Sequence, residues 1–229
     1  MEINDEIKRE IILSILKSAP SGATLKELSG TRFSSYLVEE MLSYLQTEHL
    51  ISIEGLKVMT NPEQRVRLAV KALELGGDIE RVCRLVDWKE FEEFTALAFS
   101  LSGYRVKKGF RFSSGGKRWE IDIIALRKPI TVCVDCKHWK KRLSKSSIVK
   151  VVEDHVWRTN AFIGVIKTFR EKLGLEGWAK ILTIPIIVSL HSTALKLYEG
   201  VPIVPILQLP NFINDLPTQA YSIKHLEVK

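Results

Sequence analysis

Three residues in the middle of the chain, Asp122, Asp135 and Lys137, combine the types that phosphate chemistry needs. Carboxylates are oxygen ligands of the kind Mg²⁺ takes, usually one or two of them with water and phosphate oxygens. A metal held in this way lowers the pKa of a bound water and holds a phosphate, while a lysine beside it stabilises developing negative charge. These residue types therefore suit hydrolysis of a phosphodiester.

The spacing of these residues predicts how they are positioned. Residues 119–139 are expected to form two β-strands joined by a tight turn at Lys128-Pro129, each with one apolar and one polar face. An even-length loop keeps the faces consistent and places Asp122 opposite Asp135, and Glu120 opposite Lys137. Opposed Cβ atoms lie about 5 Å apart, so two carboxylates there repel each other unless a cation lies between them. Acids and lysines on a strand are more often only solvated, but here faces, register and residue types agree.

The segments Glu120-Ile-Asp122 and Asp135-Cys-Lys137 resemble the core of the PD-(D/E)XK, or restriction-endonuclease-like, nucleases, in the Mrr-like and Holliday-junction-resolvase-like branch. Ile121 stands where the family name has proline, and Asp135 where many Mrr-like members have glutamine. The resemblance implies catalytic roles for Asp122, Asp135 and Lys137, with Asp122, Asp135 and the Cys136 carbonyl binding the metal.

The same resemblance implies a further acid on the helix before the strands. In Trp88-Lys-Glu-Phe-Glu-Glu-Phe the spacing favours Glu92 as a catalytic and metal-binding residue, with Glu93 as the alternative. From the residues alone, Glu92 is equally well an acid at the rim of an apolar helix face.

Charge is unevenly distributed along the 229 residues, whose net charge is +7. Residues 1–80 hold 9 basic and 13 acidic side chains, and the remainder holds 25 and 14. A basic, glycine-rich segment at 107–118 is expected to be a flexible loop that contacts nucleic acid. The residues expected to bind nucleic acid are Lys107, Lys108, Arg111, Lys117, Arg118, Lys140, Lys141 and Arg142.

The first 60 residues are predicted to form three helices followed by a small hairpin, an order that resembles a winged helix-turn-helix domain. Thr24 with Glu27 predicts a capping box, and Ser34 or Ser35 an N-cap. The third helix carries Glu39 and Glu40 rather than a row of basic residues, which favours protein docking or self-association over DNA reading.

The rest of the chain supplies the elements around the candidate site. Ser146 or Ser147 is expected to cap a helix that turns Val149, Val152, Val156 and Trp157 inward and Lys150 and Arg158 outward. A buried strand is expected at 181–190, and an edge strand at 201–207 because of its prolines. His155 has no visible partner and is expected to be structural.

The sequence thus predicts an α/β fold: a restriction-endonuclease-like mixed central sheet flanked by helices, preceded by a winged helix-turn-helix domain. The predicted boundaries are a winged-helix domain at 1–60, a connector helix at 61–77 and the nuclease domain at 78–229. The expected function is that of a Mg²⁺-dependent endodeoxyribonuclease, with Mn²⁺ as a plausible substitute and repair, recombination or restriction as candidate roles. The alternative is an inactive DNA-binding or partner-recruiting adaptor; an RNA-processing nuclease of similar fold is a third option.

Composition sets the expected location. No apolar run reaches the ~18 residues of a membrane span, and the acidic start of the chain has no apolar signal region. The three cysteines fit a reducing compartment, and Cys133 and Cys136 would face opposite sides of a strand, which argues against a zinc site. The expected partners are DNA and a protein partner or second copy, without a membrane, in the cytoplasm.

Overall fold

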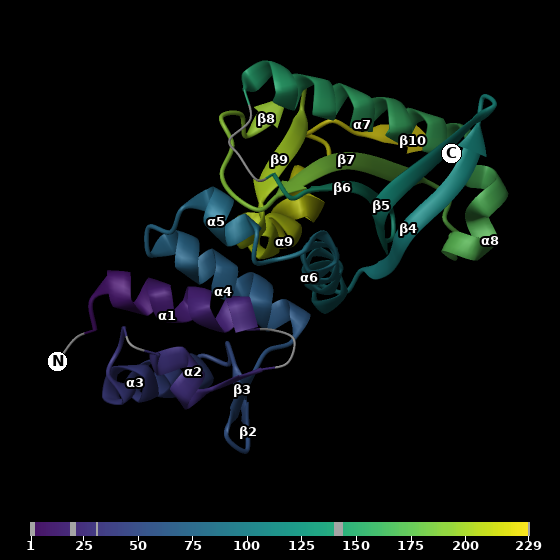
Figure 1. Ribbon diagram of the computed structural model, residues 1–229. Coiled ribbons are helices and arrows are strands. Elements are labelled where there is room, and N and C mark those ends of the chain that lie inside the picture. Colours follow the sequence, from purple (N-terminus) through teal and green to yellow (C-terminus); the bar gives the residue numbers. More distant parts are fainter. Residues whose placement is uncertain (1–2, 19–21, 31, 140–143, 229) are drawn as a thin grey trace. The chain divides into compact units, whose positions relative to one another are not determined.

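A computed structural model describes residues 3–18, 22–30, 32–139 and 144–228 (Figure 1). The chain divides into two compact units, Met1–Phe94 and Thr95–Lys229. The division falls within a helix, α6, at Trp88–Leu101. The start of the nuclease domain, which the sequence places at residue 78, stays a prediction.

The N-terminal unit is mainly helical. Before α6, its elements are α1 (Asp5–Ser18), β1 (Ala23–Thr24), α2 (Leu25–Ser29), α3 (Ser35–Thr47), β2 (Ser52–Glu54), β3 (Lys57–Met59), α4 (Pro62–Glu74) and α5 (Ile79–Cys83). The predicted caps are confirmed, with a capping box at Thr24 and Glu27 and an N-cap at Ser34. The predicted hairpin is present, and β1 adds to it in a small sheet of order β1-β3-β2. The winged-helix assignment of this region stays an interpretation.

A buried arginine connects several elements of the N-terminal unit. Arg65 on α4 is 9 % exposed. Its guanidinium donates to the carbonyl of Leu16 at 2.9 Å, to the carbonyl of Leu85 and to the carboxylate of Glu90. The side chain of Glu90 also accepts from the backbone N–H of Asp87 at 2.9 Å, so it fixes the start of α6. One side chain thereby holds the end of α1, the segment after α5 and the start of α6.

The C-terminal unit is built on a mixed sheet, as predicted. Its strands are β4 (Arg105–Ser114), β5 (Lys117–Arg127), β6 (Ile130–Lys137), β7 (Ile181–Ser189), β8 (Leu197–Tyr198), β9 (Val201–Pro205) and β10 (Leu226–Val228). The order is β4-β5-β6-β7-β9-β8, with β10 paired to β7. Antiparallel pairing joins β4, β5 and β6, whereas β6, β7 and β9 run parallel.

Helices cover this sheet. α7 (Lys145–Val165) lies along one face, and η1 (Ile166–Phe169) and α8 (Arg170–Leu173) continue from it (Figure 1). After the short turn η2 (Ile206–Gln208), α9 (Leu209–Gln219) lies on the side away from α7 (Figure 1). No helix among the described residues is both long and apolar enough to span a membrane.

The strands that carry the predicted site are drier than the sequence suggests. Every residue from Ile121 to Leu126 is buried, and so is every residue from Ile130 to Cys136. The prediction of one wet face was therefore wrong for this stretch: α7 covers the face that holds Asp135. Burial on both faces is typical of the central strands of a sheet with helices on each side.

Three local predictions were also wrong. Residues 107–118 are not a flexible loop, because β4 and β5 pair from Ser114 and Lys117 onward and only Gly115-Gly116 form the turn. The N-cap of α7 is Ser144, whose hydroxyl accepts from the N–H of Ser147 at 3.2 Å. The prolines of 201–207 predict an edge strand, but β9 lies between β7 and the two-residue β8.

Candidate functional site

The register of β5 and β6 brings Asp122 and Asp135 together. Backbone pairing runs from Arg127 with Ile130 to Ile123 with Val134, which confirms the predicted register along these residues. Asp122 and Asp135 are the next positions on the two strands. The backbone N–H of Cys136 donates to Oδ2 of Asp122 at 2.7 Å, so the Asp122 carboxylate reaches across to β6.

Asp135 is a buried carboxylate held between two cations. It is 1 % exposed, whereas Asp122 is 9 % exposed. Nζ of Lys137 lies 2.8 Å from Oδ2, and a guanidinium N–H of Arg158 on α7 donates to Oδ1 at 2.6 Å. Each oxygen of this carboxylate therefore has its own positive partner. Such partners compensate the large cost of removing a charge from water.

The same neighbours decide the protonation of Asp135. Burial alone would raise the pKa of its carboxyl group. The positive charges of His155 when protonated, of Lys137 and of Arg158 outweigh burial and hold the pKa below its usual value. Asp135 is therefore ionised at neutral pH, as a metal ligand must be.

His155 on α7 is fully buried and contacts the backbone of β6. Its Nε2 is 2.9 Å from the carbonyl oxygen of Cys133. A carbonyl only accepts, so Nε2 carries the proton in this contact. Burial lowers the pKa of the imidazole, and the charge of Asp135 opposes that shift only in part. Because His155 is then neutral at pH 7, Lys137 and Arg158 carry the compensation of Asp135. The structural role expected for His155 agrees with this contact.

Arg158 is the residue of this group that the sequence prediction placed wrongly, on the outward face of its helix. Trp157, expected inward, is 71 % exposed. The buried residues of α7 follow helical spacing, although two of them are polar: Ile148, Val152, His155, Thr159 and Phe162. This spacing could have located Arg158 from the sequence, because a buried helix face that includes His155 and Thr159 also places Arg158 beside the sheet. The prediction for Lys150 was correct, since it is exposed.

The oxygen donors at this point of the sheet are of the kind that holds a divalent metal. Asp122 and Asp135 offer two carboxylates from neighbouring strands, which fits Mg²⁺ held by one or two carboxylates and water. A group of three or more His, Cys, Asp or Glu residues suited to a metal does not occur within the described ranges. Glu92 lies on α6 in the N-terminal unit, and its role stays a prediction, as does that of the Cys136 carbonyl.

The residues predicted to bind nucleic acid lie in two places. Lys107, Lys108, Arg111, Lys117 and Arg118 are exposed on the β4–β5 hairpin. Nε of Arg111 lies 2.8 Å from Oε2 of Glu120, and the ammonium of Lys117 lies 4.1 Å from the centre of the Trp119 ring. Lys140, Lys141 and Arg142 lie outside the described residues. The hairpin thus offers a basic surface whose charge is reduced at Arg111 by its acidic partner.

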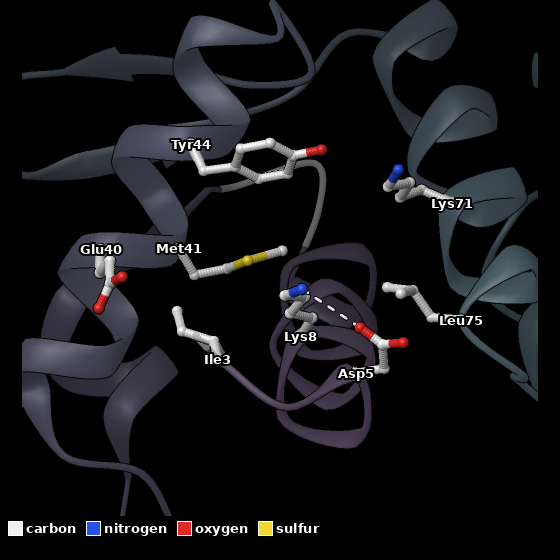
Figure 2. Close-up of a pocket in the computed structure, with 8 residues that line it drawn as sticks. All are labelled: Ile3, Asp5, Lys8, Glu40, Met41, Tyr44, Lys71 and Leu75. Carbon is white, nitrogen blue, oxygen red and sulfur yellow. Dashed lines mark hydrogen bonds and ion pairs between the residues drawn. The ribbon is translucent and has the colours of Figure 1, made fainter. Parts of the chain in front are cut away.

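A cavity in the N-terminal unit is separate from these residues. It measures about 410 Å³ and is lined from α1, α3 and α4 and the segments next to them (Figure 2). Figure 2 shows the Tyr44 hydroxyl and the Lys71 ammonium facing one space, with Lys8 paired to Asp5 at 3.2 Å beside it. None of the predicted site residues lines this cavity.

Comparison with known proteins bears on the strands just described. The family model Mrr_cat, described as a restriction endonuclease, matches residues 83–170. This segment contains Glu92, Asp122, Asp135, Lys137 and Arg158.

The chain is also similar to two other proteins. An uncharacterized protein of Archaeoglobus fulgidus is 29 % identical over 130 residues, which are 56 % of this chain and 91 % of that protein. The crystal structure of protein VC1899 from Vibrio cholerae aligns with 96 % of this chain at 12 % identity and a TM-score of 0.36. The chain spans about half of that protein, at 53 % of its length.

Proposed function

We propose that the protein is a divalent-metal-dependent endodeoxyribonuclease, with Mg²⁺ as its ion, because residues 83–170 match the restriction-endonuclease family model Mrr_cat. The observation that carries the proposal is the geometry around Asp135. Two aspartates lie side by side on adjacent strands within the matched segment, and the lysine two residues further on contacts the second. Repair, recombination and restriction are candidate settings for this activity.

The chain's own residues have distinct tasks in this proposal. Asp122 and Asp135 would hold the ion, with the Cys136 carbonyl and Glu92 as further candidate ligands. The N–H of Cys136 fixes the orientation of Asp122. Lys137 places a positive charge next to Asp135, where it can stabilise negative charge on a phosphate oxygen. The ion, when bound, would polarise the phosphate and lower the pKa of a bound water.

The basic hairpin supplies the attraction for DNA. Lysines and arginines that neutralise backbone phosphates release counterions, which is the main source of affinity that is independent of sequence. Lys107, Lys108, Lys117 and Arg118 are exposed for such contacts. Because Arg111 is paired with Glu120, we expect it to contribute less to DNA affinity than its neighbours.

The proposal is tested by removing the charge of Asp135. We expect Asp135→Asn and Asp135→Ala to reduce Mg²⁺-dependent DNA cleavage at least about 100-fold, while DNA binding is retained or strengthened. The matched control is Asp154→Asn, which removes an exposed acid from α7 and should cleave like the wild type. Circular dichroism checks that each variant is folded. Unchanged cleavage by a folded Asp135→Asn protein would refute the assignment.

A second candidate function is supported by a specific observation. Both oxygens of Asp135 already contact cations from the chain, and within the described ranges no third acid joins the two aspartates. A DNA-binding adaptor that no longer cleaves would tolerate this arrangement. Gel shifts in Ca²⁺ beside cleavage assays in Mg²⁺, on duplex, methylated, branched and single-stranded DNA, separate the two. Binding without cleavage of any substrate favours the adaptor.

A further inference from the structure

The pairing of β5 and β6 positions the two aspartates, so the contact between Arg158 and Asp135 is not required for that purpose. Lys137 follows Asp135 on the same strand, so strand geometry alone brings it near. Arg158 comes from α7, 23 residues further along the chain, and donates to the other carboxylate oxygen. Its side chain is 23 % exposed, so it reaches inward from a partly open position.

Two acidic and two basic side chains meet at this point of the sheet. Asp122 and Asp135 contribute two negative charges, and Lys137 and Arg158 contribute two positive ones. A metal is therefore not the only positive charge that can relieve repulsion between the aspartates, because Lys137 and Arg158 both contact Asp135. A divalent ion that approached Asp135 would meet two resident cations at close range.

From this balance we propose that Arg158 is a positioning residue that holds Asp135 when no metal is bound and competes with the divalent ion for it. The inference rests on the proposed function, since it assumes that the ion binds at Asp135. Its consequence is that Arg158 lowers the affinity of the site for metal.

The chemistry of arginine explains why the competition falls on Arg158. A guanidinium is not deprotonated in proteins, so it cannot yield to a metal by losing its proton. It must either stay, which weakens metal binding by repulsion, or swing away from Oδ1. Because the side chain is partly exposed, it has solvent to move into, and a guanidinium is well suited to bind a phosphate instead.

The experiment compares Mn²⁺ binding by calorimetry in the full-length wild type and in three variants. Arg158→Gln removes the charge, Arg158→Lys keeps it, and Lys150→Gln removes an exposed charge from the same helix. We expect Arg158→Gln to bind Mn²⁺ about tenfold more tightly than the wild type, because a like charge close to the ion is gone. Arg158→Lys and Lys150→Gln should bind within about twofold of the wild type.

Thermal unfolding at rising Mn²⁺ concentration provides a second measurement. Arg158→Gln should melt at a lower temperature than the wild type without metal, and its melting temperature should rise more as Mn²⁺ is added. A role only in folding would lower the melting temperature equally with and without metal. The dependence of the melting temperature on Mn²⁺ concentration also reports the affinity for Mn²⁺ of a variant that folds only when the ion is present.

The outcomes separate this inference from the proposed function. If the wild type binds Mn²⁺ and Arg158→Gln binds it no more tightly, competition by Arg158 is overturned while the nuclease assignment stands. If neither protein binds Mn²⁺, both are overturned. Tighter binding by Arg158→Gln alone supports the competition.

Discussion

At the scale of the residue, the candidate site depends on how buried charges are compensated. Asp135 is almost inaccessible to water, yet its pKa lies below the usual value because the positive charges of protonated His155, of Lys137 and of Arg158 outweigh burial. His155, on the turn of α7 before Arg158, is buried in the neutral form instead. The two buried groups therefore differ in charge: Asp135 must stay ionised, whereas His155 must stay neutral.

The buried histidine gives a prediction about pH. Because the pKa of His155 is lowered on folding, the unfolded chain takes up a proton first as the pH falls below about 6.5. The unfolding free energy of the C-terminal unit should therefore decrease as the pH falls from 7 to 5. Asp135, whose pKa is also lowered on folding, adds a further loss below about pH 4.

His155→Gln isolates this effect. Glutamine can still donate to the Cys133 carbonyl but does not titrate, so urea unfolding of this variant should depend much less on pH between 7 and 5. The matched control is Asn160→Ala on the same helix, which removes no titratable group and should keep the wild-type slope. An unchanged slope in His155→Gln would show that another group controls acid unfolding.

Sequence reasoning located the aspartates but not the arginine, for physical reasons. Strand alternation and an even loop fix the register, so Asp122, Asp135 and Lys137 followed from local rules. The inward face of α7 could not be found from apolar residues alone, because its buried stripe includes His155 and Thr159. The contact of Arg158 depends on how a helix docks on a sheet, which local spacing does not specify.

At the scale of the element, the helices of the N-terminal unit share one buried connection through Arg65. Its partners come from α1, from the segment after α5 and from α6, so their packing depends on one side chain. The helix starts were predictable because capping is a local rule that needs only a few neighbouring residues. The Arg65 contacts span 20 to 49 residues of sequence and were therefore not predictable.

Removal of this side chain should destabilise the unit strongly. We expect Arg65→Ala to lower the unfolding free energy of the N-terminal unit by about 3 kcal/mol, because the partly buried carboxylate of Glu90 loses its cationic partner. Arg67→Ala on the same helix is the matched control. Its ion pair with Glu63 is exposed and long, at 4.0 Å, so the loss should be below about 0.5 kcal/mol. Urea unfolding followed by circular dichroism measures both; equal losses would contradict the role of Arg65.

At the scale of the whole molecule, charge is divided along the chain. The first 80 residues are net acidic, whereas the remainder carries the excess of lysine and arginine. Affinity for DNA should therefore come mainly from the part of the chain that contains the candidate site. The acidic character of the first 80 residues keeps protein docking or self-association as the proposal for the N-terminal unit.

The hairpin charges give a prediction about salt. We expect Lys107→Ala combined with Arg118→Ala to weaken DNA binding about tenfold and to reduce the slope of log affinity against log salt by about 1 to 2. The control, Lys128→Ala combined with Lys196→Ala, removes the same charge elsewhere in the unit and should change the slope little. Fluorescence anisotropy between 50 and 200 mM salt measures both. Equal slopes in the two double variants would exclude the hairpin as the DNA surface.

The position of β4 has a consequence for every experiment of this kind. In the described sheet this ten-residue strand has β5 on one side and no strand on the other. A long open border of backbone groups invites another polypeptide to anneal there, and a row of lysines is a common safeguard. We therefore expect Lys107 and Lys108 to oppose such annealing, so that a variant without both lysines should assemble into fibres more readily than the wild type.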